Sequence, residues 1–345
     1  MTRQGLSRRD FILAGGAAAG ALVTGLIAGG SRASARLGSA QGLEQTRTPV
    51  VARTNGSVAQ MVGECVAELG GIERFVAGRK VAIKVNGSWS VASADTSPEV
   101  VAQVVMLARL GGATSVTVYD HTIEGATPSW NAIASAAQSQ GAQAVMLTDS
   151  SSGYVPKSVP GVGLKSAMIA RVLDQADVLI NVPKLKTHSG ANVTIGLKNH
   201  LGTVQDRGAV HDGGGYGLHQ GIADVNTCPT ISNKHCLTIC DAIQPMVTGG
   251  PEVGTYADYV GILAGLDPVA TDYIGTQIIR RYNSNVPQNP PHISKAAALG
   301  LGTNDPSKIE FEERPAGTPI PEMPSALGLA GLAGLAGLAM LKRRG

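Results

Sequence analysis

Aromatic residues are scarce in this chain of 345 residues. Phe, Trp and Tyr together make up 3% of the sequence, whereas hydrophobic residues as a whole make up 43%. The core must therefore be built from Ala, Val, Ile and Leu, with 45 glycines available for turns and close backbone contacts. This composition disfavours an aromatic-rich β-sandwich and suits a layered α/β domain.

Several catalytic signatures are also missing. The chain has no G-x-S-x-G elbow, no Walker loop, no G-x-G-x-x-G after the first strand expected in the body of the chain, and no H-E-x-x-H. The common hydrolase, kinase and dehydrogenase classes therefore have no direct support. The net charge of +3 includes basic residues at both ends, so the body is close to neutral, and nothing indicates nucleic acid as a partner.

Cysteine is sparse as well. Cys65, Cys228, Cys236 and Cys240 do not form the C-x-x-C pairs typical of zinc and iron–sulfur sites. In an oxidising compartment they would permit one or two disulfides. Because Cys236 and Cys240 lie in the run HCLTICDAI, which is typical of a buried strand, we expect them to be small core residues rather than ligands. The cofactor stays unknown, since a metal or iron–sulfur centre is an alternative that the cysteine spacing does not indicate.

Residues 1–35 resemble a twin-arginine signal peptide. Arg8 and Arg9 precede an acidic residue, a Phe and a weakly apolar stretch, and residues 33–35 (Ala-Ser-Ala) supply the small side chains that signal peptidase accepts. A plain secretory signal or an uncleaved anchor is the alternative. We expect a protein exported to the periplasm or cell surface, with the twin-arginine translocase and signal peptidase as partners. Residues 36–57 are expected to be a linker.

Residues 316–345 look like a bacterial carboxy-terminal sorting signal of the Pro-Glu-Pro type. Pro321, Glu322 and Pro324 are followed by the apolar run ALGLAGLAGLAGLAML and a basic end, although Met323 interrupts the usual motif. The apolar run is slightly shorter than the roughly 20 residues that a full membrane span requires. We expect this segment either to be recognised by a sorting enzyme or to attach the chain to the membrane.

The body, residues 58–315, alternates strand and helix patterns. Strands are expected at KVAIKVNG, SVTVYD, AQAVMLT, DVLINVP and HCLTICDAI. Helices are expected at 58–71, from Pro98, at Trp130–Gln140, at Ser166–Gln175 and from Pro268, the last with Asp267 as N-cap. This order predicts an α/β domain with a parallel or mixed sheet, helices on both faces and a loop-rich second half. Residues 205–221 are the least regular segment.

A dense polar cluster follows the strongest predicted strand. It contains three lysines and two histidines within 17 residues: Lys184, Lys186, His188, Lys198 and His200. The lysines follow a buried strand and alternate with Leu and Ile, so a solvated surface run is the weaker explanation. Such a cluster, beside glycines that permit close approach, suits a phosphate, a carboxylate or a metal-bound anion. Lys184, His188 and Lys198 are the candidate catalytic residues.

Further side chains are candidate ligand-binding residues: Lys84, Asn86, Lys186, Asn199, Asp241 and Asp272. Lys84 lies inside an apolar strand and must find a partner or reach the strand end, and Asn86 would point the same way because side chains alternate along a strand. Asp241 ends a strand, where a ligand role and turn formation are equally good explanations.

A second set suggests a metal. His211, Asp212 and His219 flank three glycines, and neutral imidazoles are common metal ligands. His188, His211 and His219 are therefore candidate metal ligands. The alternative is a mobile loop that carries ordinary polar residues.

The sequence resembles the domain-of-unknown-function 362 family. The matching stretches are VAIKVNG, TSPEVVAQVV, DVLINVPKLKTH, TIGLKNHLGTV, HCLTICDAIQPMVTGGP and GILAGLDPVATDYIG, in the family's order between about Lys80 and Gly302. The resemblance implies an α/β domain. Some relatives carry a fused ferredoxin-like module, which this chain lacks because it has no C-x-x-C array. Relatives have aliphatic residues where this chain has Cys236 and Cys240, in keeping with a core role for those thiols.

Three functions stay open. The first is an exported, enzyme-like domain that binds a small anionic ligand in a pocket lined by lysine and histidine. The second is a metal- or iron–sulfur-associated redox protein loaded before export, with Asp241 as a further ligand. The third is a non-catalytic binding module attached to the cell surface. Whether the chain is an enzyme is not decided by the sequence.

Overall fold

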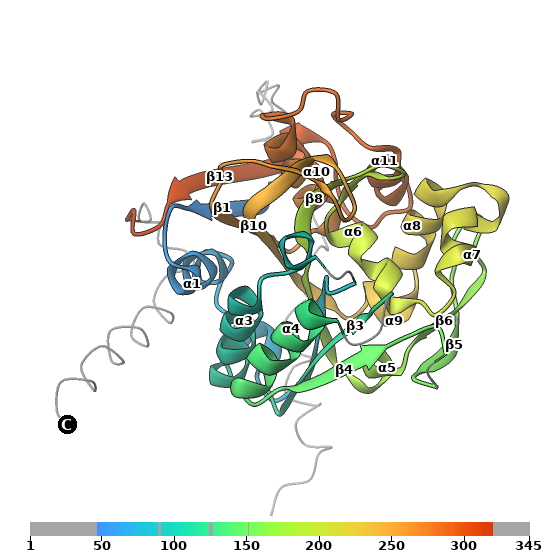
Figure 1. Cartoon of the computed structure of the whole chain (residues 1–345), viewed down its shortest axis with the longest axis horizontal. Coiled ribbons are helices and arrows are strands. Elements are labelled where there is room, and N and C mark those ends of the chain that lie inside the picture. Colours follow the sequence, from blue (N-terminus) through green and yellow to red (C-terminus); the bar gives the residue numbers. More distant parts are fainter. Residues whose placement is uncertain (1–46, 89–90, 124–126, 151, 320–345) are drawn as a thin grey trace, which may run out of the picture. The chain divides into compact units, whose positions relative to one another are not determined.

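A large mixed β-sheet forms the centre of the computed structural model, which describes residues 47–88, 91–123, 127–150 and 152–319 (Figure 1). Its main strand order is β13-β1-β12-β10-β7-β2-β3-β4. Pairing is parallel from β10 through β7, β2 and β3 to β4, and antiparallel on both sides of β12. These strands are β1 (Thr48–Thr54), β2 (Lys80–Val85), β3 (Ser115–His121), β4 (Gln143–Leu147), β7 (Val178–Val182), β10 (His235–Gly249), β12 (Gly261–Gly265) and β13 (Ile309–Pro315).

Shorter strands complete the sheet beside β10. Strand β8 (Lys184–His188) pairs with β10 in parallel, and β9 (Asn192–Thr194) and β11 (Gly254–Tyr256) add antiparallel partners to β8 and β10. A separate antiparallel hairpin joins β5 (Tyr154–Ser158) and β6 (Ser166–Ala170). The first part of the predicted polar cluster, Lys184 to His188, is therefore part of the central sheet.

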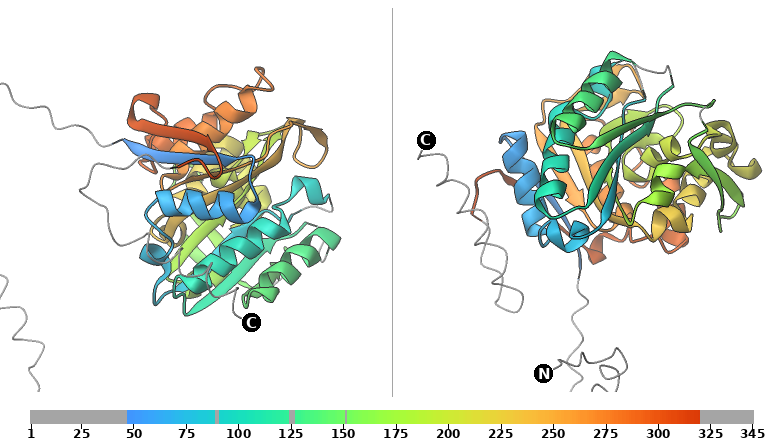
Figure 2. Two further views of the ribbon diagram at one scale, coloured as in Figure 1. Left: turned by 90° about the vertical axis from the view of Figure 1, so that its left-hand side faces the viewer. Right: turned by 90° about the horizontal axis from the view of Figure 1, so that it is seen from below.

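Helices cover both faces of the sheet, and each face has its own apolar core. Along β2, Val81 and Ile83 pack on one face, whereas Ala82 packs on the other, as the period-two pattern requires. One face carries α1 (Val58–Glu68), α2 (Glu73–Val76), α3 (Pro98–Leu110) and α4 (Pro128–Ser139), the blue to green helices of Figure 2. The other carries α5 (Arg171–Gln175), α6 (Gly196–Asn199), α8 (Leu218–Asn226), α9 (Pro229–Ser232), α10 (Pro268–Arg280) and α11 (Pro291–Ala298).

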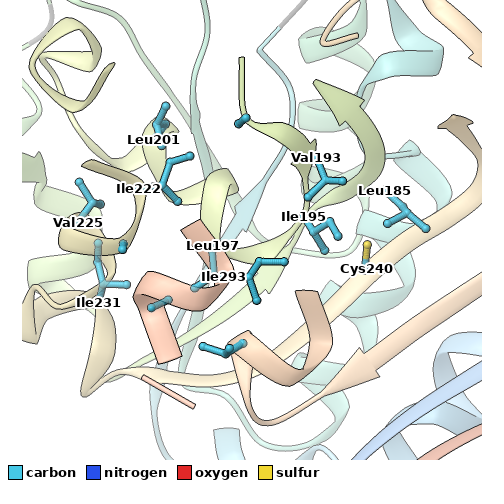
Figure 3. Close-up of a cluster of buried hydrophobic side chains, with 14 of the residues drawn as sticks. Leu185, Val193, Ile195, Leu197, Leu201, Ile222, Val225, Ile231, Cys240 and Ile293 are labelled. Atoms are coloured by element: carbon cyan, nitrogen blue, oxygen red, sulfur yellow. The ribbon is translucent and has the colours of Figure 1, made fainter. Parts of the chain in front are cut away.

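The apolar core on the face covered by α6, α8, α10 and α11 holds the segment from β8 to α6 in place. Leu185 of β8, Ile195 and Leu197 at the start of α6, and Ile293 of α11 are buried together near Cys240 of β10 (Figure 3). Each buried aliphatic side chain stabilises the fold by about 1.5–3 kcal/mol. The backbone around the polar cluster is thus supported by a dry apolar layer.

The predicted fold class is confirmed: the sheet is mixed, and helices lie on both of its faces. The predicted helix starts at Pro98 and Pro268 are confirmed as well, and Asp267 Oδ1 accepts hydrogen bonds from the N–H groups of Val269 (2.8 Å) and Ala270 (2.9 Å). Helix α4 begins two residues before the predicted Trp130, because Thr127 is its N-cap.

The linker prediction for residues 36–57 is wrong at its carboxyl end. Strand β1 lies there, beside β13 in Figure 1, with which it pairs in parallel. Its pattern was obscured by Arg53, a charged residue that is nevertheless buried because it pairs with Glu64, Glu68 and Glu312. Those partners come from other elements, so the local sequence did not reveal a strand.

The helix prediction for Ser166–Gln175 is also wrong in part. Its first half is strand β6, and only Arg171–Gln175 is helical. Residues 166–170 pair in register with residues 158–154 of β5. This non-local pairing outweighs a short apolar pattern that is equally compatible with a helix.

Short helices fill the loop-rich second half. Between α6 and α8 they are η2 (His200–Thr203), α7 (Arg207–Asp212) and η3 (Gly213–Gly215), so the segment 205–221 is more helical than expected. Two further 3₁₀ helices are η1 (Ala92–Ala94) and η4 (Pro306–Lys308).

All four cysteines are free thiols. Cys65, Cys228 and Cys240 are buried and Cys236 is partly buried, which confirms the expected core role of Cys236 and Cys240; the disulfides allowed by the sequence are not formed. None of the helices in the described ranges has the length and apolar character needed to cross a membrane. The predicted signal peptide (1–35) and the apolar part of the predicted carboxy-terminal segment lie outside those ranges.

Candidate functional site

The candidate site begins where β2 and β3 end. Lys84 of β2 is fully buried, and its Nζ donates to Asp120 Oδ1 of β3 (2.6 Å), to the Val85 carbonyl (2.6 Å) and to Asn199 Oδ1 (3.3 Å). Burial lowers the pKa of Lys84, while the Asp120 carboxylate opposes that shift. Lys84 thus has the partner that its place in an apolar strand required.

Three amides connect this ion pair to β7 and α6. Asn86 Nδ2 donates to Asn199 Oδ1 (3.2 Å), and Asn199 Nδ2 donates to Asn181 Oδ1 (2.8 Å). Asn181 Nδ2 in turn donates to the Gly196 carbonyl at the start of α6 (2.9 Å). Lys84 and Asn86 therefore point the same way, as predicted, and both meet Asn199.

The second predicted lysine, Lys184, is held by a carboxylate. Its Nζ donates to Asp241 Oδ1 (3.2 Å) and to the Ile243 carbonyl (2.8 Å). Asp241 Oδ2 accepts hydrogen bonds from the backbone N–H (2.7 Å) and hydroxyl (2.6 Å) of Ser97, the N-cap of α3. The pair therefore links β8, β10 and α3, and both groups are already engaged.

Lys186 is also engaged. Its Nζ donates to the Ala94 carbonyl (2.6 Å), and the side chain is almost completely buried. Burial lowers the pKa of Lys186 to about 8, although Asp95 and Asp120 act in the opposite direction. Lys84, Lys184 and Lys186 thus all have acceptors supplied by the fold.

Lys198 differs from the other three. Its side chain lies on α6 and is 9% exposed, and within the described ranges its ammonium group has neither a hydrogen-bond acceptor nor a carboxylate partner. Burial, followed by the positive charges of Lys186, Lys84 and Arg207, lowers the pKa of Lys198 to about 7. An ammonium group in such surroundings attracts an anion or loses its proton.

His188 presents a defined tautomer beside this lysine. Its Nδ1 accepts hydrogen bonds from the backbone N–H groups of Gly190 (3.0 Å) and Ala191 (3.2 Å), so the proton is on Nε2. Burial, followed by the charges of Lys198 and Lys186, lowers the pKa of His188 to about 3. At neutral pH, His188 is therefore a neutral Nε2–H donor.

Another imidazole, that of His292, belongs to the same neighbourhood. His292 of α11 is fully buried and stacks on His219 of α8, with their Nδ1 atoms 3.2 Å apart and one of them donating. Burial lowers the pKa of His292 to about 3, and the charges of His219, Lys198 and His188 contribute. His292 Nε2 is buried without a hydrogen-bond partner in the described residues.

Comparison with known proteins now gives the family. Residues 81–277 match the Domain of unknown function (DUF362), which is more than half of the chain. This chain belongs to that family. The match includes every predicted catalytic and ligand-binding residue, from Lys84 to Asp272.

The sequence is also similar to the thylakoid-associated protein sll1697 of Synechocystis sp., with 28% identity over 72% of this chain and 76% of that protein. Two solved structures are more distantly similar. The lactate racemase apoprotein from Thermoanaerobacterium thermosaccharolyticum has a TM-score of 0.43 at 12% identity, covering 63% of this chain and 54% of that chain. A protein from Thermotoga maritima has a TM-score of 0.38 at 12% identity, covering 70% of this chain and 57% of that chain. Neither likeness bears on the function.

In this family member, Asp272 positions the helix that carries Lys198. Its two carboxyl oxygens accept hydrogen bonds from the backbone N–H groups of Gly196 (2.7 Å) and Leu197 (3.0 Å), at the first turn of α6. Burial raises the pKa of Asp272 to about 8. Asp272 therefore acts on the site through the backbone.

Two of the predicted metal ligands, His211 and His219, lie close enough to the third, His188, to act on its pKa, but the three are not arranged as a ligand set. His211 is exposed, and its Nδ1–H donates to the Arg207 carbonyl (2.8 Å), while His219 is paired with His292. Over the ranges that the structure describes, no group of three or more His, Cys, Asp or Glu side chains is arranged to hold a metal ion.

The neighbouring glycines have a packing role. Gly213, Gly214 and Gly215 all have positive φ, and a Cβ on Gly214 would lie 2.6 Å from the backbone of Gly163. The close approach of these two loops, together with the backbone conformation, requires glycine there.

His200 lines a cavity of about 530 Å³. The cavity is also lined by His235, Asn226 and the start of α10 at Asp267 and Pro268. Asn181 Nδ2 donates to His200 Nε2 (3.2 Å), so the wall of this cavity is joined to the amide network of the site.

Several site residues were not identified from the sequence: Asp95, Asp120, Asn181 and His292. Asp120 ends the predicted strand SVTVYD in the same way that Asp241 ends the predicted strand CLTICD, so its position was a usable signal. The predicted strand end at Asp241 is wrong, because β10 continues to Gly249. Asn181 lies inside an apolar strand, as Lys84 does. His292 follows two prolines at a helix start, and no local pattern distinguishes it.

Proposed function

We propose that this α/β domain is enzyme-like and binds a small anion at Lys198, beside the neutral imidazoles of His188 and His292. One observation carries the proposal: Lys198 is the lysine of the cluster that lacks an acceptor in the described structure, whereas Lys84, Lys184 and Lys186 are all held. A largely buried charge without an acceptor in the protein is costly, and an anion would remove that cost.

The surroundings suit a small ligand with several acceptor oxygens. His188 offers an Nε2–H, and Lys198, when protonated, offers further donors. The positive charges of Lys186 and Arg207 add long-range attraction for an anion. Phosphate, sulfate and small carboxylates share this chemistry.

Sulfate tests the proposal, because it keeps its charge across the pH range in which Lys198 titrates. Isothermal titration calorimetry of the protein with sulfate at pH 6 should detect one bound sulfate per chain. Lys198→Met should weaken binding at least about tenfold, since a charge-assisted hydrogen bond contributes about 1.5–3 kcal/mol. Lys308→Met, at a lysine with a 57% exposed side chain, is the matched control and should bind like the wild type.

Affinity should also fall as pH rises through about 7, because Lys198 then loses its proton. Equal sulfate binding by the wild type and Lys198→Met would overturn the proposal.

We further propose that the domain acts outside the cytoplasmic membrane. The twin arginines at Arg8 and Arg9 and the apolar tail support this, and the related Synechocystis protein is named as thylakoid-associated. Replacing both Arg8 and Arg9 by Lys should leave the chain in the cytoplasm, as measured by cell fractionation, whereas Arg36→Lys should not. Export of the doubly substituted chain would contradict this route.

A further inference from the structure

We propose that Lys198 is a nucleophile that forms an imine with the carbonyl group of a small oxo acid. This inference rests on the proposed anion site and adds the substrate class: a molecule that carries both a carboxylate and an aldehyde or ketone. It makes Lys198 a catalytic residue rather than only a charged anchor.

The geometry singles out Lys198 from its neighbours. Lys84 is bound by Asp120, Asn199 and a carbonyl, Lys184 by Asp241 and a carbonyl, and Lys186 by a carbonyl. Fixed acceptors favour the protonated form of an amine and fix its orientation, and both effects hinder attack by its lone pair. In the part of the chain that the structure describes, the amine of Lys198 has no such acceptor, and its side chain is not sealed from solvent.

The charged surroundings favour the free amine. Lys186, Lys84 and Arg207 all act on Lys198 with positive charge, and the imidazoles of His188 and His292 lie in the same neighbourhood as neutral groups. With a pKa of about 7, a large share of Lys198 is unprotonated near neutral pH. An ordinary lysine, with a pKa near 10.4, is almost entirely protonated there.

The imine step balances with water as the only other product. The Lys198 Nζ lone pair attacks the carbonyl carbon and forms the C–N bond, while the carbonyl π electrons move to oxygen. One amine proton passes to that oxygen, giving a carbinolamine. The hydroxyl group then leaves with the second amine proton as water, and the C=N bond forms. Carbon and nitrogen are neither oxidised nor reduced by an outside reagent.

His188 is suited to position the substrate for this step. Its Nδ1 is occupied by two backbone N–H groups, so its Nε2–H is available to donate to the carbonyl oxygen. That bond would polarise the carbonyl group as negative charge builds on oxygen. The substrate carboxylate is attracted by Lys186 and Arg207, whose charges act on the same site.

Glyoxylate, the probe for this test, carries an aldehyde and a carboxylate on two carbons. The protein is incubated with glyoxylate and sodium cyanoborohydride at pH 7.5, and the reduced adduct is located by peptide mass spectrometry. We expect one carboxymethyl group on Lys198, formed at least about tenfold faster than on ordinary exposed lysines because their amines remain protonated. It should also form faster than on Lys186, which is held by the Ala94 carbonyl and has the higher pKa of about 8. Labelling should disappear in Lys198→Met and persist in Lys308→Met.

The pH dependence distinguishes the nucleophile from an anchor. The rate of labelling should rise as pH increases through about 7, whereas sulfate affinity should fall over the same range, since the two require opposite protonation states of Lys198. Added sulfate should slow the labelling.

The outcomes separate the two proposals. If sulfate binds in a Lys198-dependent manner but glyoxylate labels Lys198 no faster than Lys308, the imine inference is overturned and the anion site stands. If sulfate fails to bind and labelling is also unselective, both fail. Selective labelling that survives in Lys198→Met would place the nucleophile on another lysine and overturn the assignment.

Discussion

Lys84 Nζ lies 2.6 Å from Asp120 Oδ1, and the two side chains are 1% and 0% exposed. This buried ion pair joins the carboxyl ends of β2 and β3. Asp120 also accepts hydrogen bonds from the backbone N–H groups of Gly87 (2.7 Å) and His121 (2.7 Å), so its carboxylate organises both strand ends.

Breaking the pair from either side should be costly. Lys84→Met is expected to lower the free energy of unfolding by about 3–5 kcal/mol, because it leaves a buried carboxylate without its counter-charge. Asp120→Leu should lower the free energy of unfolding by a similar amount, because it leaves the buried ammonium group of Lys84 without its counter-charge. The double variant should lose clearly less than the sum, which urea denaturation would show as a favourable coupling term. Additive losses would mean that the two charges do not stabilise each other.

Gly202 packs directly against this pair. A Cβ at residue 202 would overlap Asp120 Oδ1 and lie 2.7 Å from Lys84 Nζ. Gly202→Ala should therefore lower stability by about 1–3 kcal/mol through overpacking.

Gly63, in the middle of α1, is the control for the Gly202 substitution. A Cβ there meets nothing within 4 Å, so Gly63→Ala should raise stability by about 0.5–1 kcal/mol through helix propensity. Thermal unfolding of both variants tests these two expectations. Unchanged stability of Gly202→Ala would show that the Lys84–Asp120 ion pair shifts easily.

Two lysines of the cluster should respond in opposite ways to the same substitution. Lys184→Met strands the buried Asp241 and should cost about 3–5 kcal/mol. Lys198→Met removes a buried, unpaired charge and should raise stability by about 1–2 kcal/mol at pH 6.

The gain at Lys198 should depend on pH. The folded pKa of about 7 lies below the unfolded value of 10.5, so the charge penalty is complete below pH 7 and disappears as pH rises toward 10.5. Urea denaturation of the wild type and Lys198→Met between pH 6 and pH 10 should therefore converge. A destabilised Lys198→Met at pH 6 would indicate a protein partner for this ammonium group.

The stability contribution of Asp272 should depend on pH over a different range. Burial raises its pKa from 3.8 to about 8, so the folded protein holds a proton that the unfolded chain releases. This group therefore makes the folded state less stable as pH rises from about 4 to about 8, after which its effect is constant. Asp272→Asn, which cannot titrate, should remove that slope.

The test of Asp272 is the difference in unfolding free energy between the wild type and Asp272→Asn, measured at several pH values. As pH rises from 4 to 8, the unfolding free energy of the wild type should fall relative to that of Asp272→Asn. A constant difference would show that Asp272 is ionised throughout, held by its two backbone N–H donors.

Local pattern was sufficient for the elements whose signals lie within a few residues. The helix starts at Pro98 and Pro268 and the strands from Lys80 and Val178 follow from capping, proline placement and apolar periodicity. The alternation of side chains along a strand also placed Lys84 and Asn86 on the same face of the sheet. Elements stabilised mainly by distant partners were missed, namely β1, whose Arg53 is neutralised by other segments, and β6, which depends on β5.

The amino-acid order was enough to show that lysines gather after the β7 strand, but the state of each lysine depends on groups far away along the chain. Lys184 meets Asp241, 57 residues on, and Lys186 meets the carbonyl of Ala94, 92 residues back. Lys198 receives no such partner in the described fold. Whether a buried ammonium group is neutralised is set by which oxygen atoms the folded chain brings within about 3 Å, and that distance is a property of tertiary packing, which neighbouring residues in the sequence do not encode.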